Sequence, residues 1–177
     1  MLSPALLVLQ ALAIAPSEPG ARFVYGQPLG VRLFEARLQD VERALGPSAT
    51  ESRLFICYVA PHQKFFVRFF VSGVDRQVTG FTMRRLIGET AAPCGALPPS
   101  APPLDVGGVA LGMSRAAVIE LLGPGPESST EAFRHFVFNN VLALVVHARF
   151  ENDHLVELSV QGGPTGSPTP IRPPGVK

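Results

Sequence analysis

Four histidines are the side chains of this sequence that are best suited to metal binding or proton transfer: His62, His135, His147 and His154. A metal site needs two or three of them to converge with a carboxylate. The strand pattern predicts that Phe138 pairs with Val141 across a two-residue turn, which points the imidazoles of His135 and His147 to opposite faces of one hairpin. The other two histidines fall in predicted turns. We therefore expect no metal site and no catalytic histidine.

Two cysteines, Cys57 and Cys94, are the next candidates for chemistry. A nucleophilic cysteine needs a nearby base to form its thiolate, and the sequence identifies no such base. An even number of cysteines in an exported protein favours a disulfide instead. Closing a loop of 37 residues would stabilise the fold by roughly 3 to 4 kcal/mol. The alternative is a pair of free thiols, with Cys57 as an ordinary core residue.

Other residues that could carry chemistry have a simpler interpretation. Ser114 precedes a helical pattern and is better explained as a helix N-cap than as a nucleophile. The glycine-rich segment 162–166 has no strand before it and no helix after it, so it does not match a phosphate-binding loop. Carboxylates such as Glu120 and Glu151 fall on predicted helix surfaces or loops. The sequence thus predicts a protein that is not an enzyme and uses no cofactor; a secreted hydrolase or metal enzyme is the least favoured interpretation.

The composition indicates a globular protein. The chain has 177 residues, of which 46% are hydrophobic and 16% charged, enough to bury a core in one domain or in two small ones. Its formal net charge is +1, and its lysines and arginines are scattered. Because the chain has no basic stripe with interleaved aromatic residues, nucleic acid is not expected as a partner.

The N-terminal segment 1–15, MLSPALLVLQALAIA, is apolar and uncharged, with small residues at Ala11, Ala13 and Ala15. Its apolar run is too short for a bilayer core of roughly 30 Å, so the pattern predicts a cleaved signal peptide and no stable membrane anchor. The alternatives are a buried N-terminal helix or a misassigned start. Export implies a periplasmic or secreted protein of the bacterial cell envelope.

The rest of the chain divides into two similar halves. Residues 41–47, VERALGP, match residues 118–124, VIELLGP, at an offset of 77. Each match is a short amphipathic segment followed by Gly, which favours a left-handed C-cap, and by Pro, which cannot continue a helix. Three strand-like runs follow each helix: 53–59, 64–71 and 77–83 in the first half, and 132–138, 141–150 and 154–160 in the second.

We therefore predict an α+β fold of two tandem units, each a short helix (or helix pair) packed on a three- to four-stranded antiparallel sheet. The predicted boundaries are a first unit at 22–86, a Pro-rich hinge at 91–103, a second unit at 104–161 and a disordered tail at 162–177. In the last hairpin, the apolar stripes of both strands share a face if residues 151–153 form a three-residue loop.

The segment 112–126, GMSRAAVIELLGPGP, resembles the Gly-Met-Ser/Thr-x-x-x-Val-x-x-Leu-Leu-Gly-x-Pro signature of two groups of proteins. They are the small lipoproteins of the outer-membrane assembly machinery, the SmpA/OmlA-like family, and the tandem-repeat β-lactamase inhibitor proteins. The likeness covers the helix and caps of the second half well, and the first half weakly. The leader contains no Cys for lipid attachment, which argues against a membrane anchor. Two units in one exported chain that can form a disulfide look more like the tandem inhibitors. That resemblance implies paired sheets that form a concave surface for another protein.

Aromatic side chains are in surplus on the predicted strands. Their main interpretation is core packing, and the alternative is that some line a groove for a partner, where aromatic anchors commonly dominate binding. The possible contact residues are Tyr58, Phe66, Arg68, Phe70, Phe136 and Phe138. Of these, Arg68 and Tyr58 are the best candidates for exposed contacts.

The sequence as a whole favours an exported, non-enzymatic protein-binding module of the cell envelope. Its expected partner is an envelope or secreted protein of unknown identity. The second interpretation is a structural or assembly component of the envelope without a discrete ligand site.

Overall fold

The computed structural model describes residues 23, 27–49, 52, 54–73, 75–86, 94–101, 104–138 and 142–164. The predicted signal peptide and residues 165–177 of the predicted tail lie outside these described residues. In chain order the elements are η1 (Pro28–Gly30), α2 (Leu38–Leu45), β1 (Phe55–Ala60), η2 (Pro61–Gln63), β2 (Phe65–Val71), β3 (Val78–Arg85), β4 (Gly95–Ala96), β5 (Asp105–Val106), β6 (Val109–Ala110), α3 (Arg115–Leu122), β7 (Glu131–Phe138), β8 (Leu142–Glu151) and β9 (His154–Pro164). The strand β9 therefore continues into residues 162–164, which were predicted to begin the disordered tail.

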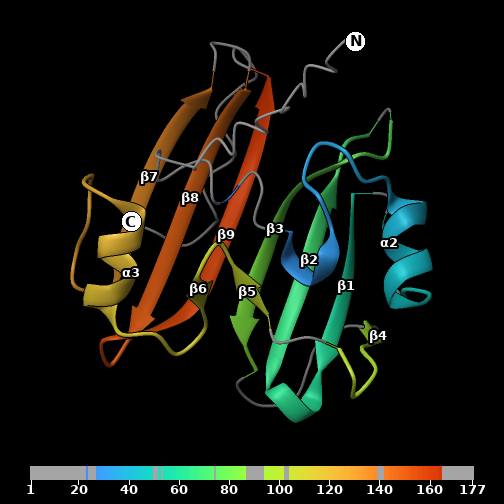
Figure 1. The fold of residues 1–177 in the computed structure, drawn as a ribbon, viewed down its shortest axis with the longest axis horizontal. Helices are drawn as coiled ribbons and strands as arrows, with labels where there is room; N and C mark the ends of the chain where they lie inside the picture. Colours follow the sequence, from blue (N-terminus) through green and yellow to red (C-terminus); the bar gives the residue numbers. More distant parts are fainter. Residues whose placement is uncertain are drawn as a thin grey trace, which may run out of the picture.

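Seven strands form one sheet in the order β4-β1-β2-β3-β9-β8-β7, and β5 and β6 form a small second sheet (Figure 1). All neighbours in the large sheet are antiparallel except β1 and β4. The prediction of two tandem helix-on-sheet units is wrong, because β3 pairs directly with β9 in one continuous sheet. Two separate sheets would leave the backbone donors and acceptors of β3 and β9 at open edges, and this pairing satisfies both.

The two α-helices of the described chain, α2 and α3, occupy the segments in which the sequence predicts helices. Each ends at a glycine with positive φ, 92° at Gly46 and 76° at Gly123, a conformation that side chains with a Cβ rarely adopt. The hydroxyl of Ser114 accepts a hydrogen bond from the backbone N–H of Ala117 at 3.4 Å, which confirms its role as N-cap. Among the described residues, no helix is both long and apolar enough to cross a membrane.

Hydrogen bonds tie the C-terminal end of each helix to an outer part of the sheet. The hydroxyl of Tyr58 in β1 donates to the backbone oxygen of Gly46 at 2.8 Å. The guanidinium of Arg134 in β7 donates to the backbone oxygen of Gly123 at 2.6 Å. Both contacts satisfy carbonyls that have no partner inside the helix.

Alternation along the strands divides the side chains of the large sheet between two faces. The first face carries buried apolar residues such as Tyr58, Val67, Met83, Leu158 and Ala148, which succeed one another across five strands. The buried residues of α2, α3 and the β5–β6 hairpin belong to the same core cluster. These elements therefore cover the first face.

The apolar stripes of β8 and β9 share the first face, as predicted, but the loop between the strands is shorter than predicted. Val146 pairs with Val160, so both stripes align. The paired strand ends enclose only residues 152 and 153, both with positive φ (49° and 63°), whereas the sequence predicts a three-residue loop. A register shift after Arg149 compensates for the shorter turn. A β-bulge in the strand thus replaces the extra residue that was expected in the loop.

The β7–β8 hairpin differs from its predicted register by one residue. Phe138 pairs with Leu142, and the predicted partner was Val141. Because side chains alternate between faces, a shift of one residue moves a whole strand's side chains to the other face. His135 and His147 therefore lie on the same face of the hairpin, and the prediction that they face opposite sides is wrong.

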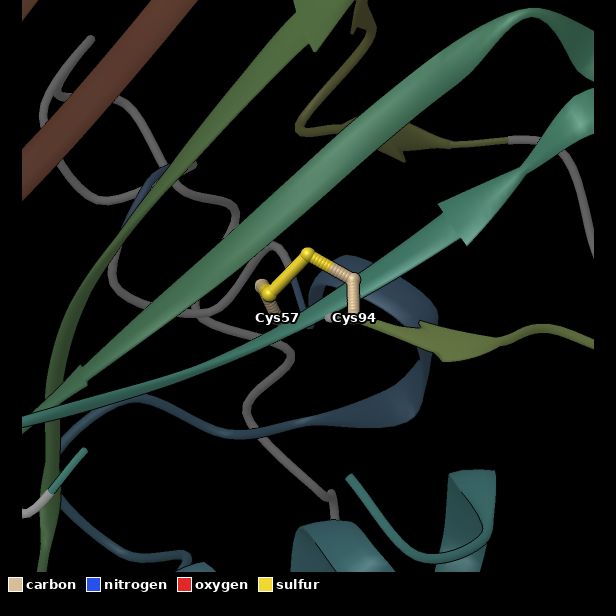
Figure 2. Close-up of a disulfide and its surroundings, with 2 residues drawn as sticks. All are labelled: Cys57 and Cys94. Carbon is tan, nitrogen blue, oxygen red and sulfur yellow. A yellow bond between two sulfur atoms is a disulfide. The ribbon is translucent and has the colours of Figure 1, made fainter. Parts of the chain in front are cut away.

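Cys57 and Cys94 form a disulfide, as predicted, with Cα atoms 4.9 Å apart (Figure 2). The disulfide lies where β4 joins the edge of the sheet, with Gly95 paired in parallel with Tyr58. The segment predicted to be a Pro-rich hinge is thus attached to β1, and its Leu97 is buried. A disulfide fits an exported protein.

Candidate functional site

The side chains that alternate with the core positions point to the second face of the large sheet. They combine aromatic rings with charged groups. They include Phe55, Phe66, Arg68, Phe70, Arg84, Glu131, Phe133, His147, Arg149 and Glu157. Phe66 is only 5% exposed, yet it does not belong to the core cluster. The second face is therefore an environment separate from the core.

Four of these residues, Phe55, Phe66, Arg68 and Arg84, form the arginine–phenylalanine cluster. The guanidinium carbon of Arg68 lies 4.4 Å from the ring centroid of Phe55 and 5.3 Å from that of Phe66. The guanidinium carbon of Arg84 lies 5.1 Å from the ring centroid of Phe66. These are cation–π distances, so the rings support two neighbouring positive charges.

The positive charge of Arg68 lies in unfavourable surroundings. Burial, and then the charge of Arg84, lowers the pKa of Arg68, and Glu157 opposes this only in part. The Nε of Arg68 is buried and has no hydrogen-bond partner among the described residues. No carboxylate of the described chain lies within 4.0 Å of either guanidinium. The cluster therefore presents two cations that the described residues leave without a contacting anion.

The charge of Arg149, on β8, is neutralised by contrast. Its guanidinium forms ion pairs with Glu151 and, at 3.4 Å, with Glu157. Burial alone would lower the pKa of Arg149, but the hydrogen bonds and charges of these two carboxylates outweigh burial and raise it. The uncompensated positive charge of the second face is thus concentrated at the β2–β3 end.

The contacts of His147 and His154 are with different partners. The ring of His147 stacks on Phe133 with centroids 4.3 Å apart, and its Nε2 lies 3.5 Å from Glu131 without forming a hydrogen bond. Nδ1 of His154 is 2.7 Å from the backbone oxygen of Asn152. Within the described ranges, no group of three or more His, Cys, Asp or Glu residues could hold a metal ion.

Five of the six predicted contact residues are placed by the structure, and they are divided between the two faces. Those on the second face are Phe66, Arg68 and Phe70. Tyr58 is fully buried on the first face, so the prediction that it is exposed is wrong. Phe136 also lies on the first face, where its ring stacks on Phe23 at 6.3 Å. The backbone of Phe138 ends β7, and its side chain lies outside the described part of the structure.

Phe55 and Arg84 are not among the predicted contact residues, although both belong to the cluster. Arg84 lies one residue beyond the predicted end of the third strand, and it pairs with Phe66 because β3 is longer than predicted. Phe55 pairs with Phe70 and approaches Arg68 diagonally. Alternation along β1 and β2 predicts that side chains two residues apart share a face. It does not predict that Phe55 and Phe66 lie on the same face as Arg84, because that depends on the register between strands.

Comparison of the chain with known protein families, with curated proteins and with solved structures finds no significant match.

Proposed function

We propose that this protein is an exported protein-binding module, and that the arginine–phenylalanine cluster binds a carboxylate-bearing segment of its partner. The observation that carries the proposal is the pair of guanidinium groups, Arg68 and Arg84, that lie over phenyl rings without a contacting carboxylate among the described residues. A planar guanidinium binds a carboxylate through two parallel hydrogen bonds. The ring of Phe55, which is partly exposed, adds apolar contact area beside Arg68.

Partial burial makes an anionic partner more favourable at this position. A charge that is partly removed from water is screened less, so it interacts more strongly with an incoming opposite charge. The lowered pKa of Arg68 has the same origin, since burial and Arg84 both disfavour its positive charge. Arginine and aromatic side chains are also enriched among the residues that dominate protein interfaces.

Export and location form part of the proposal. The disulfide between Cys57 and Cys94 supports an oxidising compartment, which in a bacterial envelope is the periplasm or the exterior. We propose a binding role without catalysis.

The test measures binding of a short peptide of alternating glutamate and phenylalanine, and of its glutamine counterpart, by fluorescence polarisation. The variant Arg68→Gln/Arg84→Gln removes both cations of the cluster. The control Arg32→Gln/Arg43→Gln removes the same charge from exposed positions outside the sheet. Because charged hydrogen bonds contribute about 1.5 to 3 kcal/mol each, the cluster variant should bind the acidic peptide at least about tenfold more weakly. The control should bind it within about twofold of the wild type, because exposed pairs contribute little.

Three results contradict the proposal. Equal binding of both peptides by the wild type would show that carboxylates are not recognised. Equal weakening by the cluster variant and the control would show that net charge, and not the cluster, attracts the peptide. If the cluster variant only lowers the urea unfolding free energy and leaves peptide binding unchanged, the cluster is structural, as in the envelope-component interpretation.

A further inference from the structure

An open cleft of about 450 Å³ lies on the side of the first face, at the ends of β2 and β3. Its lining comes from the η2–β2 junction, the last residue of β3, Leu104 just before β5, the β6 strand with the loop after it, and the first residue of β9. It is thus separated from the arginine–phenylalanine cluster by the sheet itself.

Backbone pairing explains why a cleft forms there. Along the edge of β9, the pairing with β3 extends only as far as Glu157. Further along the same edge, the backbone oxygen of Leu155 accepts a hydrogen bond from the N–H of Gly112 at 2.8 Å. The N–H of Leu155 donates to the backbone oxygen of Met113 at 2.9 Å. The end of β3 at Arg85 and the loop at Gly112 therefore approach neighbouring positions of one edge, and the cleft lies between them.

Two cations line this cleft. Arg85 pairs with Phe65 across β2 and β3, and the backbone oxygen of Lys64 accepts from the N–H of Leu86 at 2.8 Å, so Lys64 and Arg85 lie at adjacent strand ends. Neither side chain has an ion pair within 4.0 Å in the described part of the chain. Among the described residues that line the cleft, none is Asp or Glu. An anion bound in the cleft would be attracted by both charges.

Two local features of the lining agree with a ligand site. Lys64 adopts a left-handed conformation (φ 55°, ψ 41°), which non-glycine residues rarely adopt and which is found more often at ligand sites. At the rim, Nδ1 of His154 donates to the backbone oxygen of Asn152, because a carbonyl can only accept. This hydrogen bond holds the imidazole of His154, which lines the cleft, in one orientation.

We infer that this cleft binds a small organic anion, with its carboxylate held by Lys64 and Arg85 and its apolar part against Phe65, Leu104 and Leu111. A volume of about 450 Å³ lies within the range of small-molecule sites. Combined apolar and cationic lining selects a carboxylate with a hydrocarbon portion over an inorganic anion. This inference goes beyond the proposed function and does not depend on it, since it concerns other residues on the opposite side of the sheet.

The test is a titration followed through the backbone amide NMR signals of Leu104, Leu111 and Gly112. The probes are hexanoate, N-acetylleucine, hexanamide and inorganic phosphate. Hexanoate represents a free aliphatic acid and N-acetylleucine a peptide C-terminus; whichever binds more tightly identifies the source of the carboxylate. A ligand of this size should bind with a Kd on the order of 1 mM. Hexanamide and phosphate should each bind at least about tenfold more weakly, because each lacks one of the two features.

The variants separate the cleft from the rest of the protein. Lys64→Gln/Arg85→Gln should weaken binding of the better carboxylate at least about tenfold, and each single variant about threefold. The control Arg84→Gln should leave this affinity within about twofold, since its side chain lies on the second face. Hexanamide binding as tightly as hexanoate, or the double variant retaining wild-type affinity, would overturn the inference. If the double variant is unfolded by circular dichroism, the single variants decide, and unchanged affinity in both overturns it.

Discussion

Arg84 and Arg85 are adjacent in β3, yet their side chains lie on opposite faces of the large sheet. Arg84 pairs with Phe66 and lies over its ring, whereas Arg85 pairs with Phe65 and lines the cleft. Substitution of either arginine by glutamine removes one positive charge at nearly the same place in the chain. Each substitution is therefore the control for the other. Arg84→Gln should weaken acidic-peptide binding and spare hexanoate, and Arg85→Gln should do the reverse. Paired titrations of both variants check this, and a loss of both activities in one variant would point to a general charge effect.

Removal of the disulfide should lower the stability of the fold. Cys57→Ala/Cys94→Ala opens a loop with a sequence separation of 37 residues. The chain-entropy relation predicts a decrease of roughly 3 to 4 kcal/mol in the free energy of unfolding. Urea denaturation of the variant and of the reduced wild type should give the same loss. A decrease below about 1 kcal/mol in both would mean that pairing between β1 and β4 keeps this region ordered in the denatured chain as well.

Tyr58→Phe should cost about 1 kcal/mol at neutral pH, because it removes the hydroxyl that donates to the backbone oxygen of Gly46. Burial, with a smaller contribution from Glu42, raises the pKa of Tyr58 to about 12. A raised pKa favours the neutral phenol in the folded state, so this contribution is complete below about pH 10 and is lost as the pH rises toward 12. The difference in unfolding free energy between wild type and variant should therefore shrink from pH 10 to 12. A constant difference over this range would contradict the assignment.

Arg134 is the buried charged side chain of the described core, with 4% of its surface exposed. It donates to the backbone oxygens of Gly123 and Pro126 at 2.6 and 2.9 Å and forms an ion pair with Glu127 at 3.3 Å. Arg134→Ala leaves these carbonyls without their donor and should lower the unfolding free energy by about 2 to 4 kcal/mol. Glu127→Gln removes the ion pairs of Glu127 with Arg134 and, at 3.7 Å, with Arg115, but it keeps the backbone acceptors of Arg134, so it should cost less than Arg134→Ala. Chemical denaturation measures both, and equal losses would show that the ion pair, not the backbone contacts, dominates.

The contact between β3 and β9 leaves no room for a side chain at Gly80. A Cβ at this position would lie 2.5 Å from the backbone oxygen of Val160 and 3.0 Å from the Cα of Gln161. Gly80→Ala should therefore push the two strands apart and destabilise the protein by about 1 to 3 kcal/mol. Gly73→Ala, where a Cβ would have no neighbour within 4 Å, is the matched control and should be neutral or slightly stabilising. Thermal melts of both variants test whether the two halves depend on one shared sheet; equal melting temperatures would contradict this dependence.

Local signals accounted for the helices and for most strand positions. The Leu-Gly-Pro ends of α2 and α3 were predictable because a left-handed glycine and a following proline act within one turn of chain. The Cys57–Cys94 disulfide followed from cysteine count and the expected compartment. The apolar stripe of β9 predicted its buried face correctly even though the adjoining turn proved shorter than expected.

The register within the hairpins was less predictable, because one residue decides which face a side chain occupies. Phe138 pairs with Leu142 instead of the predicted Val141, and this difference of one residue places His135 and His147 on the same face. Tyr58 was placed on the wrong side for a related reason. Its aromatic ring and hydroxyl suit an exposed contact as well as a buried hydrogen bond, and only the position of Gly46 at the end of α2 distinguishes them.

The sequence by itself determined where α2, α3 and the long strands lie and which residues are bridged, because those features depend on neighbours in the chain and on composition. Only the tertiary structure decided that β3 pairs with β9 in one sheet. It alone placed Arg68 and Arg84 over the rings of Phe55 and Phe66, and Arg85 in the cleft. The physical reason is that an unpaired strand edge carries the same backbone donors and acceptors whatever its side chains, so its partner is chosen by the packing of the whole core.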